Sequence, residues 1–340
     1  MSPANGPAAT PANSPANSFS IGVDLGGTNL RIAAVSPQGE ILEKIALDTE
    51  VKEGRERVIT DMTGAVKDLQ GRMKSSRLMG IGIGVPGVIN LATGMIRQSP
   101  NLPGWNDFPV RDDIERQLNA PVILENDANA AALGEKWVGA GKTVSGLCIL
   151  TLGTGIGGGV ILDGRIWHGQ DGMGGELGHM TIDPNGALCG CGNLGCIEAY
   201  ASATAILRMA HAAIAVGRSP ALRKAAEEVG ELTAEMIYIT AQQGDRVSRE
   251  IFELVGRSLG VAIGNLINIF NLPLYVLAGG VARGWDAFAS YLLDEVQKRS
   301  VVYRATQARI EPSQLGAEAG LLGAAYLPFQ AAGNGAAAAR

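Results

Sequence analysis

The feature of this sequence that most restricts its fold is a structural plan that occurs twice. Residues 19 to 49 read FSIGVDLGGTNLRIAAVSPQGEILEKIALDT. They predict an apolar strand, a Gly-Gly-Thr turn, a second strand, a turn at Pro-Gln-Gly and a third strand. Residues 145 to 168, SGLCILTLGTGIGGGVILDGRIWH, repeat the plan with a Gly-Thr-Gly turn and an Asp-Gly hairpin signal. Because helical and strand-like segments follow each unit, we expect an α/β chain with two related halves.

The two glycine turns indicate phosphate binding. Glycines let backbone N-H groups approach an anion, and Thr28 or Thr154 can add a hydroxyl donor. The run from Gly153 also fits the dinucleotide fingerprint G-x-G-x-x-G, but that motif requires a helix to begin at the glycines. Here the β-rich run GVILDGRIW follows instead. Two tight hairpins are the plain alternative, but their matching positions favour a nucleotide held between the halves.

Composition restricts the class of protein. The chain has 340 residues with 46% hydrophobic content, and 28 Lys+Arg against 33 Asp+Glu give a formal charge of -5 without a long basic run. We therefore expect a soluble protein that binds neither nucleic acid nor a membrane. The leader 1–18 and the tail 331–340 are predicted to be disordered. Four cysteines, three of them within eight residues, suit a metal site in the cytoplasm better than a disulfide framework.

Polar residues stand where predicted strands end. PVILENDANAAALGEKWVG predicts a strand ending at Glu125 and a helix capped by Asn126 or Asp127. Side chains at the carboxyl end of such a strand project into the ligand crevice of an open α/β sheet, so Asp127 is placed for chemistry, although a plain helix cap is the commoner role. Asn101 in the loop SPNLPGWND could line a pocket, and Gly279 and Gly280 could let backbone approach an adenine or ribose.

The segment HMTIDPNGALCGCGNLGCIE, residues 179 to 198, holds a candidate metal site. His179, Cys189, Cys191 and Cys196 offer one imidazole and three thiolates, the tetrahedral ligand set that zinc prefers. Four protein ligands leave no open position, which predicts a structural ion. The spacing disfavours a disulfide or three free thiols. The loop would hold Glu176 and Glu198 near one point, where carboxylates suit a ligand rich in hydroxyl groups, unless both are ordinary surface residues.

The string GELGHMTIDPNGALCGCGNLGCIEAYAS closely resembles the signature of the ROK family (repressors, open reading frames and kinases). DLGGTNLR resembles its first phosphate motif, LENDANAAALGE its catalytic strand and helix, LGTGIGGGVI its second phosphate motif and LAGGV its adenosine motif, in the family's order across roughly residues 19 to 327. Among members the sequence looks most like the bacterial glucokinases. The resemblance implies the actin, Hsp70 and hexokinase type of fold, with two α/β domains around a cleft, and ATP-dependent phosphorylation of glucose at its 6-hydroxyl.

The resemblance also implies domains and residue roles. A small domain of residues 19–129 and 318–330 and a large domain of residues 130–317, with a zinc loop at 179–196, are expected. Asp127 matches the general base, and Asp24 matches the residue that organises magnesium. The implied sugar-binding residues are Asn101, Asn126, Asp127, Glu176, His179 and Glu198. The implied zinc ligands are His179, Cys189, Cys191 and Cys196. The implied nucleotide-binding residues are Asp24, Gly26, Gly27, Thr28, Asn29, Gly153, Thr154, Gly155, Gly279 and Gly280.

Alternatives remain within this resemblance. A sugar-sensing repressor of the family would carry an N-terminal helix-turn-helix, whereas eighteen low-complexity residues precede Phe19. The acceptor could instead be N-acetylmannosamine, N-acetylglucosamine, fructose, mannose or allose, and polyphosphate could replace ATP. The family's habit implies a homodimer or homotetramer in the cytoplasm.

Overall fold

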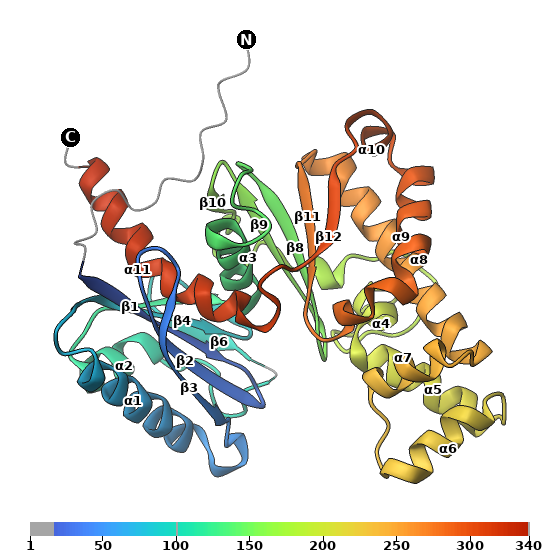
Figure 1. Cartoon of the computed structure of the whole chain (residues 1–340), viewed down its shortest axis with the longest axis horizontal. Coiled ribbons are helices and arrows are strands. Elements are labelled where there is room, and N and C mark those ends of the chain that lie inside the picture. Colours follow the sequence, from blue (N-terminus) through green and yellow to red (C-terminus); the bar gives the residue numbers. More distant parts are fainter. Residues whose placement is uncertain (1–16, 100, 339–340) are drawn as a thin grey trace. The chain divides into compact units, whose positions relative to one another are not determined.

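The computed structural model describes residues 17–99 and 101–338, and these form two compact units (Figure 1). The first unit contains the described residues up to Leu147, the segment Gly159–Gly175 and the described residues from Gln314 onward. The second unit contains Cys148–Gly158 and Glu176–Ser313. This division differs from the expected domain boundaries, because residues 130–147, 159–175 and 314–317 belong to the first unit.

The first unit is built on a mixed five-stranded sheet with the strand order β3-β2-β1-β4-β7. Strands β1, β4 and β7 are parallel neighbours, whereas β2 pairs antiparallel with both β1 and β3. The expected succession of strand, glycine turn, strand, turn and strand at the start of the chain is confirmed. The strands are β1 Ser18–Leu25, β2 Asn29–Val35, β3 Ile41–Asp48, β4 Arg77–Val85 and β7 Val122–Asn126.

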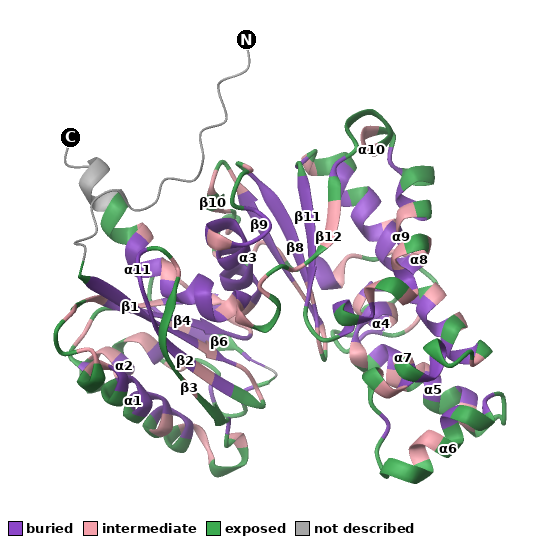
Figure 2. Ribbon diagram, in the orientation of Figure 1, coloured by how far each residue is buried: buried purple, intermediate pink, exposed green. Residues whose placement is uncertain are grey.

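Helices cover both faces of this sheet. Apolar side chains of β1, such as Ile21 and Val23, form one core with Met62 of helix α1 and Ile114 of helix α2. A second core joins β2 to helices α3 and α11. Figure 2 shows β1 buried and the edge strand β3 largely exposed. The helices are α1 Arg55–Arg72, α2 Val110–Leu118, α3 Asp127–Val138 and α11 Ala319–Ala338.

Glycines allow α11 to lie close against the sheet. Gly22 of β1 and Gly82 of β4 are register partners. A Cβ atom at Gly22 would overlap the carbonyl oxygen of Leu321, and one at Gly82 would overlap that of Ala324. Both carbonyls belong to α11, so the short distance between helix and sheet depends on the absence of these two side chains.

The second sheet contains the repeat of the opening plan. Its strand order is β10-β9-β8-β11-β12, and β11 runs parallel to β8 and β12. The expected Gly-Thr-Gly turn joins β8 to β9, and Asp163 and Gly164 form the hairpin turn with left-handed φ angles of 50° and 78°. The strands are β8 Leu147–Leu152, β9 Ile156–Leu162, β10 Arg165–Ile166, β11 Leu274–Ala278 and β12 Arg309–Pro312.

Helices make up most of the second unit. The long helix α8 is buried along much of its length, including Phe252, Leu259 and Ile263. The helices are α4 Glu198–Ala201, α5 Ala203–Ala215, α6 Pro220–Val229, α7 Ala234–Gln242, α8 Arg246–Phe270, α9 Trp285–Arg299 and α10 Val301–Thr306. Short strands β5 Val88–Asn90 and β6 Met95–Gln98 form a hairpin in the first unit.

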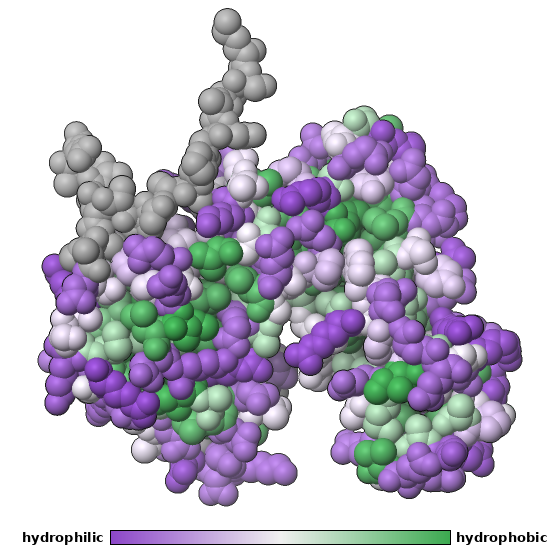
Figure 3. Space-filling model, viewed as in Figure 1, coloured by the Kyte–Doolittle hydropathy of each residue, from purple (hydrophilic) through white to green (hydrophobic). Residues whose placement is uncertain are grey.

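Among the described residues, none of the helices combines the length and the apolar character needed to cross a bilayer. Figure 3 shows hydrophilic side chains interspersed with smaller apolar areas on the face that it draws.

The structure describes parts of both chain ends that the sequence predicts to be disordered. The expected tail 331–340 is wrong over residues 331–338, because α11 continues to Ala338. Alanine has the highest helix propensity, so an Ala-rich end extends a helix that packing has already started. At the other end, β1 begins at Ser18, and the carbonyl oxygen of Asn17 accepts the N-H of Arg77 at 2.9 Å. The rest of the leader, residues 1–16, lies outside the described residues.

Candidate active site

The carboxyl ends of three parallel strands meet at one edge of the first sheet. Asp24 of β1 is the register partner of Gly84 in β4, and Gly84 is the partner of Glu125 in β7. Asn126 and Asp127 follow Glu125 directly. The candidate magnesium residue Asp24 and the candidate base Asp127 therefore stand at the same edge, which is where ligands bind in open α/β sheets.

Asn126, and not Asp127, is the N-cap of helix α3. Its Oδ1 accepts the N-H groups of Ala128 at 2.9 Å and Asn129 at 3.2 Å, while its Nδ2 donates to the carbonyl oxygen of Gly87 at 3.2 Å. Asp127 is the first residue of α3 and is half-buried, and its carboxylate accepts the N-H of Ala128 at 2.9 Å. The helix N-terminus favours the charged form of this carboxylate.

The first glycine turn lies beside Asn101. The N-H of Gly26 donates to the carbonyl oxygen of Asn29 at 2.9 Å, which closes the turn. A Cβ atom at Gly27 would lie 3.1 Å from the carbonyl oxygen of Asn101, so the loop that carries Asn101 packs directly on the turn. Thr28 and Asn29 are exposed and available to a ligand.

Asp24 has the environment of a residue that works with a cation. Burial raises the pKa of its carboxyl group, and the nearby guanidinium of Arg31 opposes this, with its Nη1 3.5 Å from Asp24 Oδ2. The raised pKa means that the carboxylate is less stable here than in water, and a cation bound beside it would favour the charged form. An oxygen ligand of this kind suits magnesium, which binds few protein groups and keeps several waters.

The second glycine turn is anchored to helix α5. The N-H of Gly153 donates to the carbonyl oxygen of Gly155 at 2.9 Å, and the carbonyl oxygen of Gly153 accepts the N-H of Ala203 at 2.8 Å. The hydroxyl of Thr204 donates to the carbonyl oxygen of Thr154 at 2.7 Å. Strand β9 follows the turn, as expected from the sequence, whereas a Rossmann fingerprint would have a helix at this position.

A cavity of about 330 Å³ opens beside this turn in the second unit. Gly153, Thr154 and Gly280 line it, as the nucleotide assignment requires. Gly279 has a left-handed φ of 90°, and a Cβ atom there would meet the backbone of Leu152, so this position excludes other residues. Sequence reasoning missed Glu235, Tyr238 and Arg283, which also line the cavity. Arg283 follows the GGV motif by two residues, whereas nothing in the helical pattern around Tyr238 marks it.

The four candidate metal ligands come together in the second unit. Their ligand atoms all lie within 4.8 Å of one another. Cys191 Sγ lies 3.7 Å from Cys196 Sγ, and Cys189 Sγ lies 3.7 Å from His179 Nδ1. Tetrahedral zinc with bonds of about 2.3 Å to sulfur separates two sulfurs by roughly 3.8 Å. The sulfur separation excludes a disulfide and fits a zinc ion, in agreement with the predicted ligand set.

Glu198 connects the metal cluster to the second glycine turn. Its Oε2 accepts the backbone N-H of Ile156 at 2.9 Å, and its Oε1 lies 3.5 Å from Cys189 Sγ. A Cβ atom at Gly155 would overlap the Glu198 carboxylate. Glu176 is exposed, and its carbonyl oxygen accepts the N-H of His179 at 3.1 Å. The cluster and its neighbour Glu198 therefore form one local structure with the turn.

Known proteins resemble this chain over nearly its whole length. The family model described as "ROK family" matches residues 20–331. The glucokinase of Thermotoga maritima is 39% identical over 90% of this chain and 96% of its own length. The xylose repressor of Caldicellulosiruptor bescii is 33% identical over 89% of this chain and 76% of its own length.

A solved structure shares the fold. The ROK family glucokinase of Streptomyces griseus, in complex with glucose and AMPPNP, has a TM-score of 0.77 and 30% identity, covering 92% of this chain and 100% of that one. This structure confirms the expected actin and hexokinase type of α/β fold. The family match, the relatives and the shared fold lead to one conclusion: the chain belongs to the ROK family.

Proposed function

We propose that the protein phosphorylates glucose at its 6-hydroxyl with ATP, giving glucose 6-phosphate and ADP. The observation that carries the proposal is the placement of Asp127 and Asn126 at the carboxyl edge of the first sheet, in a chain 39% identical to the Thermotoga maritima glucokinase. The complex of the Streptomyces griseus enzyme with glucose and AMPPNP supports both substrates.

In this proposal Asp127 acts as the general base. The oxygen of the sugar 6-hydroxyl attacks the γ-phosphorus, the bond between that phosphorus and the ADP oxygen breaks, and the hydroxyl proton passes to the Asp127 carboxylate. A positioned base of this kind contributes roughly 10² to 10⁴ in rate. The other sugar hydroxyls would bind Asn101, Asn126, Glu176, His179 and Glu198.

The two glycine turns would hold the nucleotide. Backbone N-H groups and the hydroxyls of Thr28 and Thr154 suit the phosphates, and the cavity lined by Gly280 and Tyr238 suits the adenosine. Asp24 would hold the magnesium ion that, when bound, neutralises charge on the β- and γ-phosphates. Asp24 lies at the carboxyl end of β1, directly before the Gly26–Asn29 turn, so the ion would be close to the phosphates held by that turn.

The zinc ion would have a structural role. It would close the loop of residues 179–196, in which the buried apolar side chains are those of Cys189 and Cys196. His179 would bind the metal through Nδ1, the atom that faces Cys189, so that Nε2 stays available to a sugar hydroxyl. The metal would thus fix the tautomer and the orientation of this imidazole.

Coupled measurement of ADP release with magnesium-ATP tests the proposal. The panel contains glucose, fructose, mannose, allose, N-acetylmannosamine and N-acetylglucosamine, with polyphosphate as a second donor. We expect the highest kcat/KM with glucose and ATP. A higher kcat/KM with another sugar or with polyphosphate would show that the proposed acceptor or donor is wrong. Absence of turnover with every pair would contradict a kinase, and the similarity to the xylose repressor would then favour a sugar-binding regulator.

We also propose that the enzyme works in the cytoplasm as a homodimer or homotetramer, apart from membranes and nucleic acid. A cluster of three cysteines that fits zinc supports a reducing compartment. The formal charge of -5 disfavours nucleic acid as a partner. Light scattering coupled to gel filtration measures the subunit number, and a monomer at assay concentrations would contradict this part of the proposal.

A further inference from the structure

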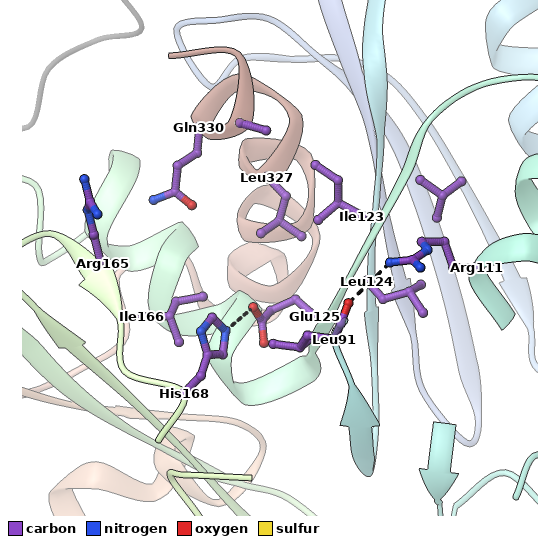
Figure 4. A pocket seen from close by; sticks show the side chains of 12 residues that line it. Leu91, Arg111, Ile123, Leu124, Glu125, Arg165, Ile166, His168, Leu327 and Gln330 are labelled. Atoms are coloured by element: carbon purple, nitrogen blue, oxygen red, sulfur yellow. Dashed lines mark hydrogen bonds and ion pairs between the residues drawn. The ribbon is translucent and has the colours of Figure 1, made fainter. Parts of the chain in front are cut away.

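Glu125 and His168 form a close pair in the first unit. His168 Nε2 lies 2.7 Å from Glu125 Oε2, although the residues are 43 positions apart in the chain. The pair lines a cavity of about 410 Å³, and Figure 4 shows the imidazole and the carboxylate pointing toward each other. None of the roles assigned above to the active site uses this pair.

Glu125 is buried and its carboxylate is fully engaged. Glu125 is 4% exposed and lies in β7, two residues before α3 begins. Its Oε1 accepts the backbone N-H of Asn126 at 2.9 Å and the side-chain amide of Asn129 at 3.0 Å, and its Oε2 faces His168. Burying a carboxylate is costly unless hydrogen bonds or a counter-charge compensate, and His168 supplies the partner for the second oxygen.

The charged groups around the imidazole identify Glu125 as its dominant partner. Arg111 of α2 and Arg165 of β10 line the same cavity, and Gln330 of α11 adds an uncharged amide. Arg111 is occupied by the carbonyl oxygens of Leu91 and Ala92, at 3.3 and 3.1 Å. The hydrogen bond to Glu125 raises the pKa of His168, while burial opposes the shift. Protonation of His168 therefore strengthens its interaction with Glu125.

The two residues of the pair are connected along the chain to different parts of the proposed site. Glu125 directly precedes Asn126 and Asp127, and it holds the first turn of α3 through Asn126 and Asn129. His168 begins the loop 168–175, which continues to Glu176, and its carbonyl oxygen accepts the N-H of Gly174 at 2.9 Å. A change at His168 thus reaches the base by way of Glu125.

We propose that His168 is a positioning residue for phosphoryl transfer, holding the Glu125 carboxylate that in turn orients the first turn of α3 and its general base, Asp127. The inference rests on the proposed function. It makes the positioning of Asp127 sensitive to the protonation of His168, and it gives a role to a histidine that neither binds the metal nor contacts the sugar.

The expected effect falls mainly on kcat. Asn126 keeps its own contacts with Ala128, Asn129 and Gly87, so the amide proposed to bind the sugar is held without His168. Asp127 depends on the backbone at the junction of β7 and α3, where Glu125 accepts the N-H of Asn126. A small displacement of a reacting group can cost about 10²-fold in rate. We expect His168→Ala to lower kcat by roughly 10- to 100-fold and to change the KM for glucose by less than about threefold.

Three variants make the test specific. His168→Ala removes the partner of Glu125, and His168→Gln keeps an N-H donor near the position of Nε2 but cannot gain a proton. His211→Gln is the matched control, because His211 is an exposed histidine on α5. We expect His168→Gln to recover most of the lost kcat and His211→Gln to match the wild type. Thermal unfolding and zinc content, measured for each variant, separate positioning from loss of folding.

Recovery of kcat by added imidazole and the pH dependence of kcat are two measurements that distinguish positioning from a general loss of stability. The cavity borders the imidazole, so added imidazole should restore part of the kcat of His168→Ala and none in His168→Gln. The ratio of wild-type kcat to that of His168→Gln should fall as the pH rises through the raised pKa of His168, because the imidazole then loses the proton that it shares with Glu125.

The outcomes separate this inference from the proposed function. An active wild type with a His168→Ala variant of equal kcat and equal pH profile would overturn the inference and leave the kinase intact. So would an equal loss of kcat in His168→Ala and His168→Gln without imidazole rescue. A wild type without turnover on any sugar would overturn both.

Discussion

Glu198 accepts a hydrogen bond from the backbone N-H of Ile156, at 2.9 Å, across 42 positions of sequence. The other carboxylate oxygen of Glu198 lies 3.5 Å from Cys189 Sγ. One side chain therefore joins the glycine turn proposed for the phosphates to the cluster proposed for zinc, and this link explains why a structural metal belongs near a kinase site.

Removal of the Glu198 side chain should weaken the binding of both glucose and ATP. Glu198→Ala leaves the N-H of Ile156 without its acceptor and frees space against Gly155, where the carboxylate now packs. We expect the KM for glucose and the KM for ATP to rise together, by roughly tenfold each. Steady-state kinetics measure this, with Glu227→Ala on the exposed side of α6 as the control. A rise in the KM for glucose alone would show that Glu198 does not support the turn.

Loss of one metal ligand should unfold the zinc loop. Cys191→Ala should lower bound zinc from one ion per chain to near zero and lower Tm by roughly 10 °C, because zinc sites contribute several kcal/mol or more and each kcal/mol shifts Tm by about 2–4 °C in domains of 150–250 residues. Metal analysis and calorimetry check this result. Cys148→Ala is the control, since Cys148 lies in β8 and burial raises the pKa of its thiol to about 12. Retention of full zinc by Cys191→Ala would contradict the ligand set.

A methyl group at Gly82 should separate α11 from the first sheet. Its Cβ would overlap the carbonyl oxygen of Ala324, so Gly82→Ala should lower the free energy of unfolding by about 1–3 kcal/mol. Gly64→Ala is the matched control, because Gly64 lies within α1 with open space where its Cβ would be. That control should gain about 0.5–1 kcal/mol. Equal stability of the two variants in denaturant titrations would show that the close contact is relaxed in solution.

The pair of His168 and Glu125 should make stability depend on pH. The pKa of His168 is raised in the folded state, so the pair stabilises the protein fully below the unfolded pKa of about 6.5. This stabilisation is lost as the pH rises through the folded pKa. The difference in unfolding free energy between wild type and His168→Gln should therefore be larger at pH 6 than at pH 9, by denaturant titration at both values. A constant difference would mean that the imidazole does not titrate against Glu125.

Sequence reasoning succeeded where the signal was local. Alternating apolar residues around two glycine turns predicted β1 to β3 and β8 to β10, and ligand chemistry predicted the cluster of His179 and three cysteines. The prediction for the Ala-rich end failed because composition alone does not distinguish a disordered tail from the continuation of α11. The pair of Glu125 and His168 was missed because it depends on tertiary contact. Tyr238 was missed for the same reason, since its helical pattern is equally that of a packed core residue.

The most direct test of the account is the kcat of Asp127→Asn. The amide keeps the size of the side chain but cannot accept the hydroxyl proton, so kcat should fall by roughly 10² to 10⁴ while glucose still binds with near-normal affinity by calorimetry. Asp163→Asn is the control, because Asp163 occupies an exposed hairpin turn with a left-handed φ of 50° that asparagine tolerates. We expect the Asp127→Asn protein to fold, to bind glucose and to show very little turnover. Near-normal kcat in that variant would contradict this expectation.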